Sequence, residues 1–568
     1  MSTRKCVAIA ALIASVAGGA LAQSPPPIAI SKPTSAAASL MFRQGGAAPA
    51  AGPSLLTPAP DARLERGSAS EAGVIRSRVA ALDLIGLRAL LAAPNLMVDQ
   101  DGRPIGTPPT FTLALFDDIS VRLVKLDATE DDFGLVSLRA VLAGDVSGTA
   151  TLVIDRDTVT GSIKVGGRYF SILGAGEGRH RVFELDAAGV RTVKDDARRP
   201  FGLGESGERA AVTRVIEDPL HGAAGRERQS ADTTITLMVS YTPAASQVIP
   251  NIKSAIALAV SDTNTVLSNS QIPAEIRLVG IDRVDYAENG ATMAEVLDDL
   301  TNGVGDFDRV QRTRSALRAD LVSVVSRTSD ACGLAWLNDE LDSRFASNAA
   351  RFGASLVTAN VGGTCLATNT LAHEIGHNLG AEHDRFAVTD DVPGPSKFNY
   401  GYVDLTGRFR DVMSYDDECD QANVSCEEIP FFSNPALMYQ GRPIGVAADQ
   451  PAAADVSRKI RATVANAARL DSQLVSPTTP ILSVLVDGNG RVSSTPAGID
   501  CGDKCSAEFS SGQQVSLVAA ASPRAEMRAW SGDCAGEGSC SVNMASSKAV
   551  TATFDPAERS GPIFSTAQ

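Results

Sequence analysis

The first long stretch of alternating apolar and polar residues lies between Thr110 and about Leu185. Runs such as Ile119–Val124 and Thr149–Ile154 place an apolar residue at every second position, with glycine-containing turns between the runs. A period of two is typical of half-buried β-strands. We therefore predict a β-rich domain in this part of the chain.

From residue 231 onward, strand patterns alternate with helical ones, which favours a mixed sheet covered by helices. The expected elements are, in order, a strand at Thr234–Tyr241, a helix from Gln247 to about Leu267, a strand at Glu275–Ile281, a helix around Met293–Leu300, a strand at Ala319–Val325 and a helix from about Ala367 to Leu379.

A short Pro/Thr-rich linker, Val475–Pro480, separates this region from a compact C-terminal segment. Strand-like runs recur there at Leu482–Leu485, Gln514–Val518 and Ala549–Phe554. The segment also holds the last four cysteines and Trp530. These features indicate a small β module stapled by disulfides.

The N-terminus has the pattern of a signal peptide. Arg4 and Lys5 precede an apolar run from Cys6 to Val16, and Ala20-Leu-Ala22 then offers a small-residue cleavage site. A membrane anchor is the alternative, but the run is short and rich in Ala and Gly. We expect cleavage after Ala22, a secreted extracellular protein and no stable membrane insertion.

Composition is that of a globular protein, with 44% hydrophobic and 21% charged residues. The formal net charge of −15 argues against a protein that binds nucleic acid or anionic membranes non-specifically. The sequence assigns no oligomeric state.

Cysteine usage fits an oxidising compartment. Cleavage of the signal peptide removes Cys6 and leaves eight cysteines, and an even number in an exported chain indicates disulfides. We expect Cys332–Cys365 and Cys419–Cys426 to pair. The last four, Cys501, Cys505, Cys534 and Cys540, leave their connectivity open, and a second metal site built from them is the alternative.

Histidine is rare in this chain, yet three of its five histidines lie within the eleven residues His373-Glu-Ile-Gly-His-Asn-Leu-Gly-Ala-Glu-His383. On a helix, His373 and His377 share one face and can bind one ion. Gly380 can end the helix in a left-handed turn and bring His383 back as a third ligand.

Three protein ligands leave a fourth position open for water, as a catalytic zinc site requires. Zinc lowers the pKa of bound water and polarises a substrate carbonyl. Glu374 stands beside the first ligand and is the candidate general base, because it can take the proton of that water and pass it to a departing amine. We therefore predict one catalytic Zn²⁺ held by His373, His377 and His383, acting on protein or peptide substrates.

The run from His373 to His383 resembles the HExxHxxGxxH signature of the metzincin metallopeptidases, in which a Met-turn follows. Asp411-Val-Met413-Ser-Tyr415 is the Met-turn candidate, and its methionine is expected to form an apolar floor under the ligands. Asp384, directly after the third histidine, is similar to the reprolysin or adamalysin branch. The resemblance covers roughly residues 231–472 and includes Phe432–Pro435 and Gly441–Gly445.

The resemblance implies further roles. Tyr415 resembles the tyrosine that astacins and serralysins use as a displaceable zinc ligand, and could stabilise an oxyanion; a packed aromatic is the alternative. Many metzincins are kept latent by a propeptide cysteine, but no cysteine remains between the signal peptide and Cys332. We hypothesise instead that residues from about 60 to 230 block the cleft sterically or with a carboxylate.

Two further features suggest additional roles. An acidic cluster could hold Ca²⁺, or could be a solvated loop held by its disulfide; it comprises Asp416, Asp417, Glu418, Asp420, Glu427 and Glu428. The C-terminal module resembles bacterial repeats related to internalin B-repeats, which are extracellular β appendages.

The prediction is thus an α+β protein whose metzincin-like catalytic domain, with a mixed sheet and a zinc-motif helix, lies between a β-rich propeptide and a small disulfide-linked β module. For the β-rich region, an accessory unit is the alternative to a propeptide. We predict a secreted zinc endopeptidase made as a zymogen. The alternative is a catalytically silent surface or adhesive protein that binds through its C-terminal module. The expected divisions are a signal peptide at 1–22, a flexible leader at 23–60, propeptide and linker at 61–230, the peptidase domain at 231–474, a linker at 475–480, the β module at 481–556 and a tail at 557–568.

Overall fold

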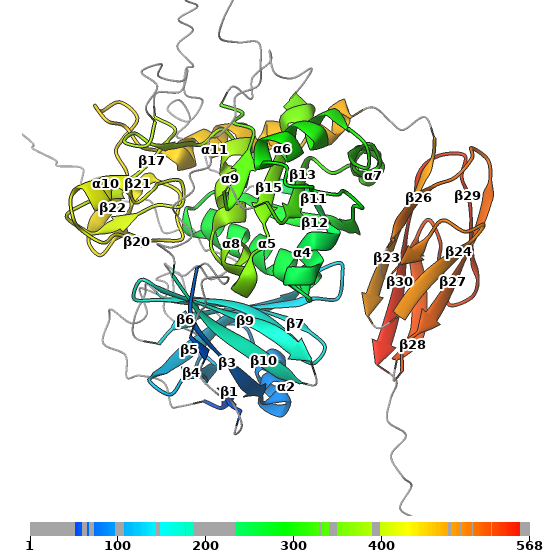
Figure 1. Ribbon diagram of the computed structural model, residues 1–568, viewed down its shortest axis with the longest axis horizontal. Helices are drawn as coiled ribbons and strands as arrows, with labels where there is room; N and C mark the ends of the chain where they lie inside the picture. The colour runs from blue at the N-terminus through cyan, green and yellow to red at the C-terminus, as the bar shows by residue number, and fades with distance from the viewer. Residues whose placement is uncertain are drawn as a thin grey trace, which may run out of the picture.

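A computed structural model shows three bodies (Figure 1): a closed sheet drawn blue to cyan, a central α/β domain drawn green to amber, and a sandwich drawn orange to red. The residues it describes are 52–59, 65–66, 73–96, 107–143, 148–176, 178–186, 233–328, 331–339, 349–388, 398–474, 479–488, 490–501, 504–523 and 525–556. The expected signal peptide, the linker before residue 231, most of the 475–480 linker and the C-terminal tail lie outside them.

The first body, which we call the N-terminal domain, is a sheet closed on itself. Strand β1 (Ser54–Pro58) closes it by pairing with β3 (Val74–Leu82) and with β4 (Thr110–Phe116). Helix α2 (Leu84–Ala92) packs against β1. The other strands are β2 (Glu65–Arg66), β5 (Ile119–Glu130), β6 (Val136–Leu142), β7 (Thr149–Asp155), β8 (Thr158–Val165), β9 (Arg168–Gly176) and β10 (Arg179–Leu185). Their inward side chains form one apolar core, as the period-two pattern predicted.

His180 lies inside this sheet as a neutral structural histidine. It is fully buried on β10, and its Nε2 accepts a hydrogen bond from the N–H of Val159 at 2.8 Å. Burial lowers the pKa of the imidazole, although the charge of Asp157 opposes this. Protonation would therefore break a hydrogen bond and leave a charge in an apolar core.

Acidification is expected to destabilise the N-terminal domain through His180. The folded state resists protonation because its histidine pKa is lowered, so the unfolded chain binds more protons once the pH falls below about 6.5. Unfolding of the domain should therefore need less denaturant at pH 5.0 than at pH 7.5. His180→Gln keeps an acceptor without the charge and should show a smaller pH effect. Equal pH effects in both proteins would contradict this role.

The central domain is built on a five-stranded mixed sheet in the order β12-β11-β13-β15-β14. Neighbouring strands are parallel, except that edge strand β14 runs antiparallel to β15. All six residues of β13 are buried, as expected for a parallel strand covered on both faces. The strands are β11 (Thr233–Tyr241), β12 (Ala274–Arg283), β13 (Leu321–Ser326), β14 (Gly333–Ala335) and β15 (Ala354–Thr358).

Helices cover both faces of this sheet. Helices α5 (Ile252–Asn269) and α9 (Thr370–Asn378) share a core with one face, and α6 (Met293–Asn302) and α7 (Phe307–Leu317) share one with the other. Two short helices, α4 (Pro243–Val248) and α8 (Thr364–Ala367), precede α5 and α9.

Residues 398–474 complete the central domain. Helix α11 (Val456–Ala467) packs its buried face into the α5–α9 core, and the Cys419–Cys426 disulfide joins α10 (Asp417–Gln421) to the segment before β20. The short strands around it are β16 (Glu382–Asp384), β17 (Tyr400–Gly401), β18 (Val403–Asp404), β19 (Phe409–Arg410), β20 (Glu427–Glu428), β21 (Asn434–Tyr439) and β22 (Arg442–Ile444).

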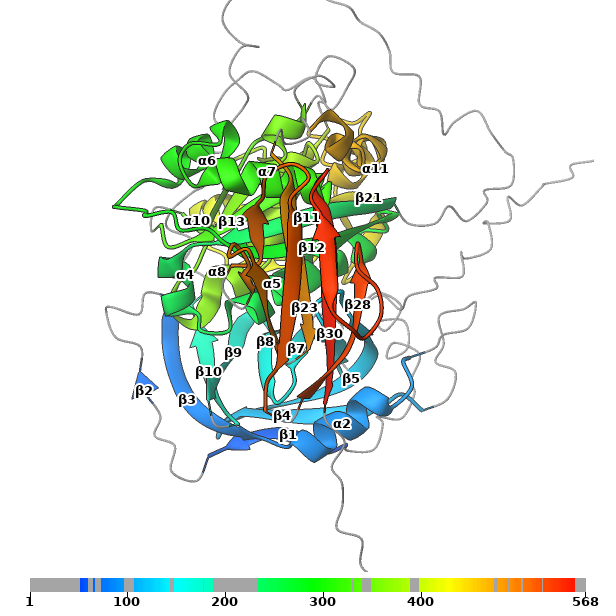
Figure 2. The ribbon, with the colours of Figure 1, turned by 90° about the vertical axis from the view of Figure 1, so that its right-hand side faces the viewer.

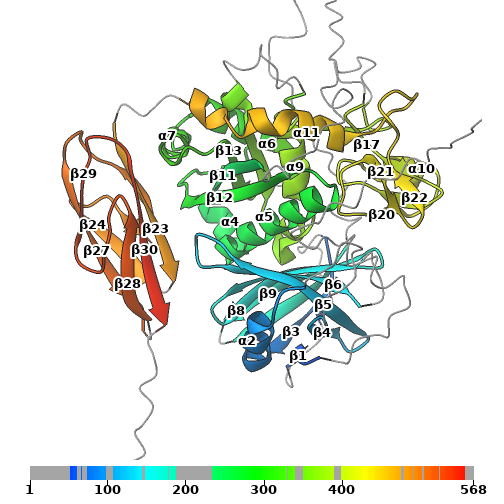
Figure 3. The ribbon, with the colours of Figure 1, turned by 180° about the vertical axis from the view of Figure 1, so that it is seen from behind.

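The third body is a sandwich of two four-stranded sheets around a core that contains Trp530. It contacts α7, where Arg309 pairs with Asp282 and donates to the Ser506 hydroxyl at 3.0 Å. Its strands are β23 (Ile481–Gly488), β24 (Gly490–Thr495), β25 (Asp500–Cys501), β26 (Ser506–Glu508), β27 (Gln514–Ala521), β28 (Ala525–Gly532), β29 (Cys540–Asn543) and β30 (Lys548–Pro556). Figure 2 views the sandwich in front of the central domain, and Figure 3 shows the two bodies side by side; in both views the N-terminal domain lies below the central domain.

The disulfides confirm the cysteine predictions and complete them. Cys332–Cys365 and Cys419–Cys426 pair as expected. Among the last four cysteines, Cys501 pairs with Cys505 and Cys534 with Cys540. Because all four sulfurs are in disulfides, the alternative of a second metal site there is wrong.

Three details of the sequence prediction are corrected. The flexible leader cannot extend to residue 60, because β1 lies within it; five residues ending in proline are too few to show a strand period. The helix expected from Gln247 is interrupted at Pro250, and the one expected from Ala367 is interrupted at Thr368–Asn369.

In the part of the chain that the structure describes, no helix has the length and apolarity needed to cross a bilayer.

Candidate metal centre

Helix α9 carries two of the three candidate ligands because of its position in the core. Leu371 and Ile375 are buried in the core that α9 shares with the sheet and α5, and His373 and His377 lie on another face of the helix. These two histidines are four residues apart and therefore share one face of the helix.

Gly380 makes the reversal that returns the third ligand. Its φ is +96°, and a Cβ there would lie 2.6 Å from Lys459 Cε and 3.0 Å from the carbonyl oxygen of Asn338. Only glycine fits this conformation and this space. The chain then forms β16, which pairs with β17 and places His383 opposite α9.

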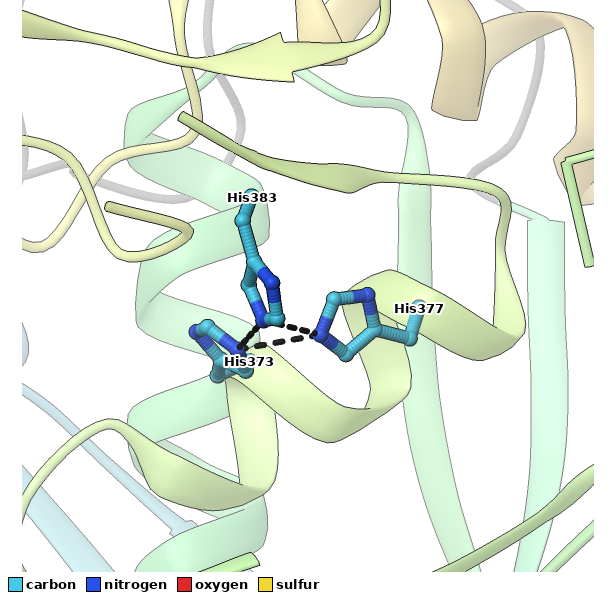
Figure 4. Close-up of side chains that lie close together, drawn as sticks. All are labelled: His373, His377 and His383. Carbon is cyan, nitrogen blue, oxygen red and sulfur yellow. Dashed lines mark hydrogen bonds between the residues drawn. The ribbon is translucent and has the colours of Figure 1, made fainter. Parts of the chain in front are cut away.

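The three imidazoles converge on one point (Figure 4). His377 Nε2 lies 3.0 Å from Nε2 of His373 and 3.0 Å from Nε2 of His383, and the last two atoms are 3.2 Å apart. All three side chains are buried, and they are the only group of three or more potential ligands found among the described residues.

Backbone carbonyls fix the tautomers of two of these rings. His373 Nδ1 donates to the Val412 carbonyl at 2.8 Å, and His377 Nδ1 donates to the Ala381 carbonyl at 2.8 Å. Both Nε2 atoms therefore carry lone pairs rather than protons. A hydrogen bond from the second ring nitrogen to a carbonyl orients a histidine that binds metal through its other nitrogen.

The donor set fits a tetrahedral zinc ion. Ligand bonds of 2.0–2.1 Å in a tetrahedron give nitrogen–nitrogen separations of about 3.3 Å, close to the spacing of the three Nε2 atoms. The lone pairs of His373 Nε2 and His377 Nε2, 3.0 Å apart, repel each other unless a proton or a cation lies between them. The geometry therefore suits three histidine ligands with one position left open.

Glu374 lies in the next position along α9 and faces the edge strand of the sheet. Its side chain is 1% exposed, and a Cβ on Gly333 would lie 2.1 Å from Glu374 Oε1. The Glu374 carboxylate thus occupies the space that a side chain at position 333 of β14 would fill. The Cys332–Cys365 disulfide joins the start of this strand to α8 and holds it beside the site.

Met413 forms an apolar floor beneath α9, as the resemblance implied. It is fully buried, and a Cβ on Gly376 would lie 2.7 Å from its sulfur. Gly376 stands between the two histidines on the helix, so the methionine packs directly behind the ligands.

Asp384 and Asp411 hold the segment that follows Met413. Asp384 Oδ2 accepts the N–H of Tyr415 at 2.9 Å, and this places the Tyr415 hydroxyl 3.1 Å from His383 Nε2. Asp411 is fully buried and accepts the Ser414 hydroxyl at 2.6 Å and the Ser433 N–H at 2.7 Å. Burial raises the pKa of Asp411 to about 7, although these donors oppose the shift.

Three carboxylates of the acidic cluster form contacts within the protein. Asp416 and Glu428 form ion pairs with the buried guanidinium of Arg410, at 2.7 and 2.9 Å. Glu427 accepts the Tyr439 hydroxyl at 3.0 Å. Three of the six carboxylates are thus used in contacts within the protein, and calcium binding by the cluster stays a prediction.

The structure brings together His373, Glu374, His377 and His383, with Tyr415 at their edge. Gly333 and Asp411 were not recognised in the sequence. Two features of the sequence could have pointed to them. Gly333 directly follows Cys332, and Asp411 is the first residue of the Met-turn candidate.

Similarity to known proteins agrees with this geometry. The family profile described as metallo-peptidase family M12B, reprolysin-like, matches residues 229–440. A protein of Xanthomonas campestris pv. campestris named peptidyl-Asp metalloendopeptidase is 28% identical over 360 residues, which are 62% of this chain and 79% of that protein. A protein of the same name from Pseudomonas aeruginosa is 31% identical over 238 residues, 38% of this chain and 37% of that protein.

Structural similarity is weaker. The crystal structure of metalloproteinase-II from Bacteroides fragilis covers 49% of this chain and 82% of that chain, with 14% identity and a TM-score of 0.31.

Proposed function

The chain is a metalloendopeptidase, and we propose that it hydrolyses protein substrates at one zinc ion held by His373, His377 and His383. The observation that carries this proposal is the convergence of three Nε2 atoms within 3.0–3.2 Å. Nitrogen ligands with an open fourth position are typical of catalytic zinc. When bound, zinc lowers the pKa of a water molecule and polarises the scissile carbonyl.

Glu374 is the proposed general base. Its carboxylate adjoins the first ligand and is held against Gly333, so it can reach a water that lies over the histidine cluster. A carboxylate oxygen of Glu374 takes one proton from this water as the water oxygen attacks the carbonyl carbon of the peptide bond. The carboxyl group of Glu374 then gives that proton to the amide nitrogen as the C–N bond breaks.

Strand β14 is the proposed platform for the substrate. Among the described strands it pairs only with β15, on one of its two edges, and its Gly333 adjoins Glu374. An extended peptide can add to such an edge through backbone hydrogen bonds. This would bring a scissile bond next to the carboxylate.

The name shared by the relatives extends the proposal to bonds beside aspartate. We expect digestion of a denatured, disulfide-free protein to yield new termini enriched in aspartate on one side of the cut. Mass spectrometry of the peptides measures this enrichment directly. Cuts distributed without regard to aspartate would remove this extension and leave the endopeptidase proposal in place.

Tyr415 is proposed to stabilise the oxyanion of the tetrahedral state, because its hydroxyl lies 3.1 Å from His383 Nε2. Loss of one such donor costs roughly 10²-fold in kcat. Tyr415→Phe should therefore lower kcat by about this factor, while KM and zinc content change little. An unchanged kcat would instead assign Tyr415 to packing.

We also propose that the chain is secreted and made as a precursor. Four disulfides support an oxidising compartment. A separate folded body precedes the central domain, with residues 187–232 between the two. Blocking of the cleft by the N-terminal region stays a prediction. The adhesive alternative is not favoured, since the proposed ligands and base are all present in one place.

A further inference from the structure

One buried carboxylate on the central domain receives the N-terminal domain. Asp262 Oδ1 accepts the Thr151 hydroxyl at 2.6 Å, and Oδ2 accepts the Ser162 hydroxyl at 2.8 Å. The Lys164 ammonium lies 3.7 Å from the same Oδ2. Asp262 lies on α5 and its three partners lie on β7 and β8, so the contact joins two bodies. A buried carboxylate needs such partners, which makes the contact specific.

Apolar contacts surround this polar centre. Leu135 and Val153 of the N-terminal domain form one buried cluster with Ala257 and Leu258 of α5. Phe183 and other residues of β9 and β10 belong to the main core of the central domain. Burial of this kind is typical of permanent interfaces, which resemble a domain core cut in two.

The N-terminal domain also approaches the central domain closely at Gly362, before α8. Gly362, at φ +78°, has no side chain, and a Cβ there would lie 3.2–3.4 Å from Val74, Leu185 and Phe183. The Ser171 hydroxyl donates to the Gly362 carbonyl. Strand β9 therefore rests directly on the backbone before α8.

Helix α5 is buried on most of its surface, as is typical of a helix with neighbours on several sides. Thirteen of its eighteen residues are buried, whereas a surface helix buries one stripe. One side of it packs on the sheet and α9, and strands β7 and β8 run across another. Without the N-terminal domain, α5 would expose Ala257 and Leu258 to water.

The contact also reaches the zinc helix. Lys164 donates to Asn369 Oδ1 at 2.5 Å, and Asn369 Nδ2 donates to Glu428 Oε1 at 2.8 Å. Asn369 is the residue before the first turn of α9, four positions before His373. The N-terminal domain thus holds the start of the helix that carries the ligands.

We propose that the N-terminal domain is a permanent subunit of the enzyme, which stays bound to α5 through the Asp262 contact after the chain between the two bodies is cut. The test does not depend on natural processing or on activity. A recognition sequence for a site-specific protease is inserted after Gly225 of the full chain, and the protein is cut to completion. The two fragments are then followed by size-exclusion chromatography and by sedimentation.

We expect the fragments to migrate together at micromolar concentration, with a dissociation constant below about 1 μM. Asp262→Ala should raise this constant by about 100-fold or more, because two hydrogen bonds to a charged group are lost. Thr151→Val combined with Ser162→Ala removes the same bonds from the other body and should act alike, even if Asp262→Ala fails to fold. Asp285→Ala, a change at an exposed ion pair with Arg283, is the matched control and should leave the constant unchanged.

Separation of the wild-type fragments as soon as the chain is cut would overturn the proposal. Wild-type affinity in both the Asp262 variant and the Thr151/Ser162 variant would also overturn it, because the contact would then not be what holds the domain.

Discussion

Glu374→Gln is expected to abolish most of the peptidase activity and leave the metal in place. Glutamine has the shape of glutamate and fits the space beside Gly333, but it cannot accept the proton of the attacking water. Loss of a general base lowers kcat by roughly 10²–10⁴-fold. The amide is not a ligand, so the zinc content should stay at one ion per chain, and KM should change little.

The measurement combines steady-state kinetics on a peptide substrate with metal analysis of the same sample. Glu526→Gln, an exposed substitution of the same type in the sandwich, is the control and should keep full activity. A kcat within about twofold of wild type for Glu374→Gln would show that another group takes the proton.

His377→Ala is expected to remove metal and activity together. His377 Nε2 is 3.0 Å from both other Nε2 atoms, so its loss leaves two nitrogens where three are needed. Activity should fall below about 1% of wild type, because zinc supplies both the activated water and the polarised carbonyl. The Nδ1 bond to Ala381 is lost as well, so the return of the chain to His383 should also loosen.

Metal analysis after dialysis distinguishes this variant from Glu374→Gln, in which zinc is retained. His180→Gln is the matched control, since it changes a buried histidine of the N-terminal domain that has no place in the cluster. Full zinc occupancy in His377→Ala would contradict the assigned ligand set.

Local spacing explains why the histidine cluster could be predicted. The i,i+4 pair and Gly380 are properties of eleven consecutive residues, and the helix geometry turns them directly into a position in space. The position of Met413 under the cluster was expected from the resemblance. The structure shows why the methionine can pack so close to α9: residue 376 is a glycine and has no side chain there. The strands between Thr110 and Leu185 followed from their period in the same way, whereas β1, β2 and β3, which precede them, were not predicted.

Long-range contacts explain what the sequence did not reveal. Gly333 meets Glu374 across 41 positions of the chain, and no local pattern marks that contact. Asp262 looks like an ordinary polar residue of a helix until β7 and β8 are placed against it. Helix α7 was missed because its arginines interrupt the apolar spacing; Arg309 and Arg312 contact the sandwich, and Arg314 is buried against the backbone of Ala319.

The most direct test of the account is casein digestion by the purified wild-type protein before and after removal of its metal. We predict that a chelator stops digestion, that dialysed metal-free protein stays inactive, and that one equivalent of Zn²⁺ restores the rate. Digestion that continues at the original rate in protein shown to be metal-free would contradict a zinc mechanism at His373, His377 and His383.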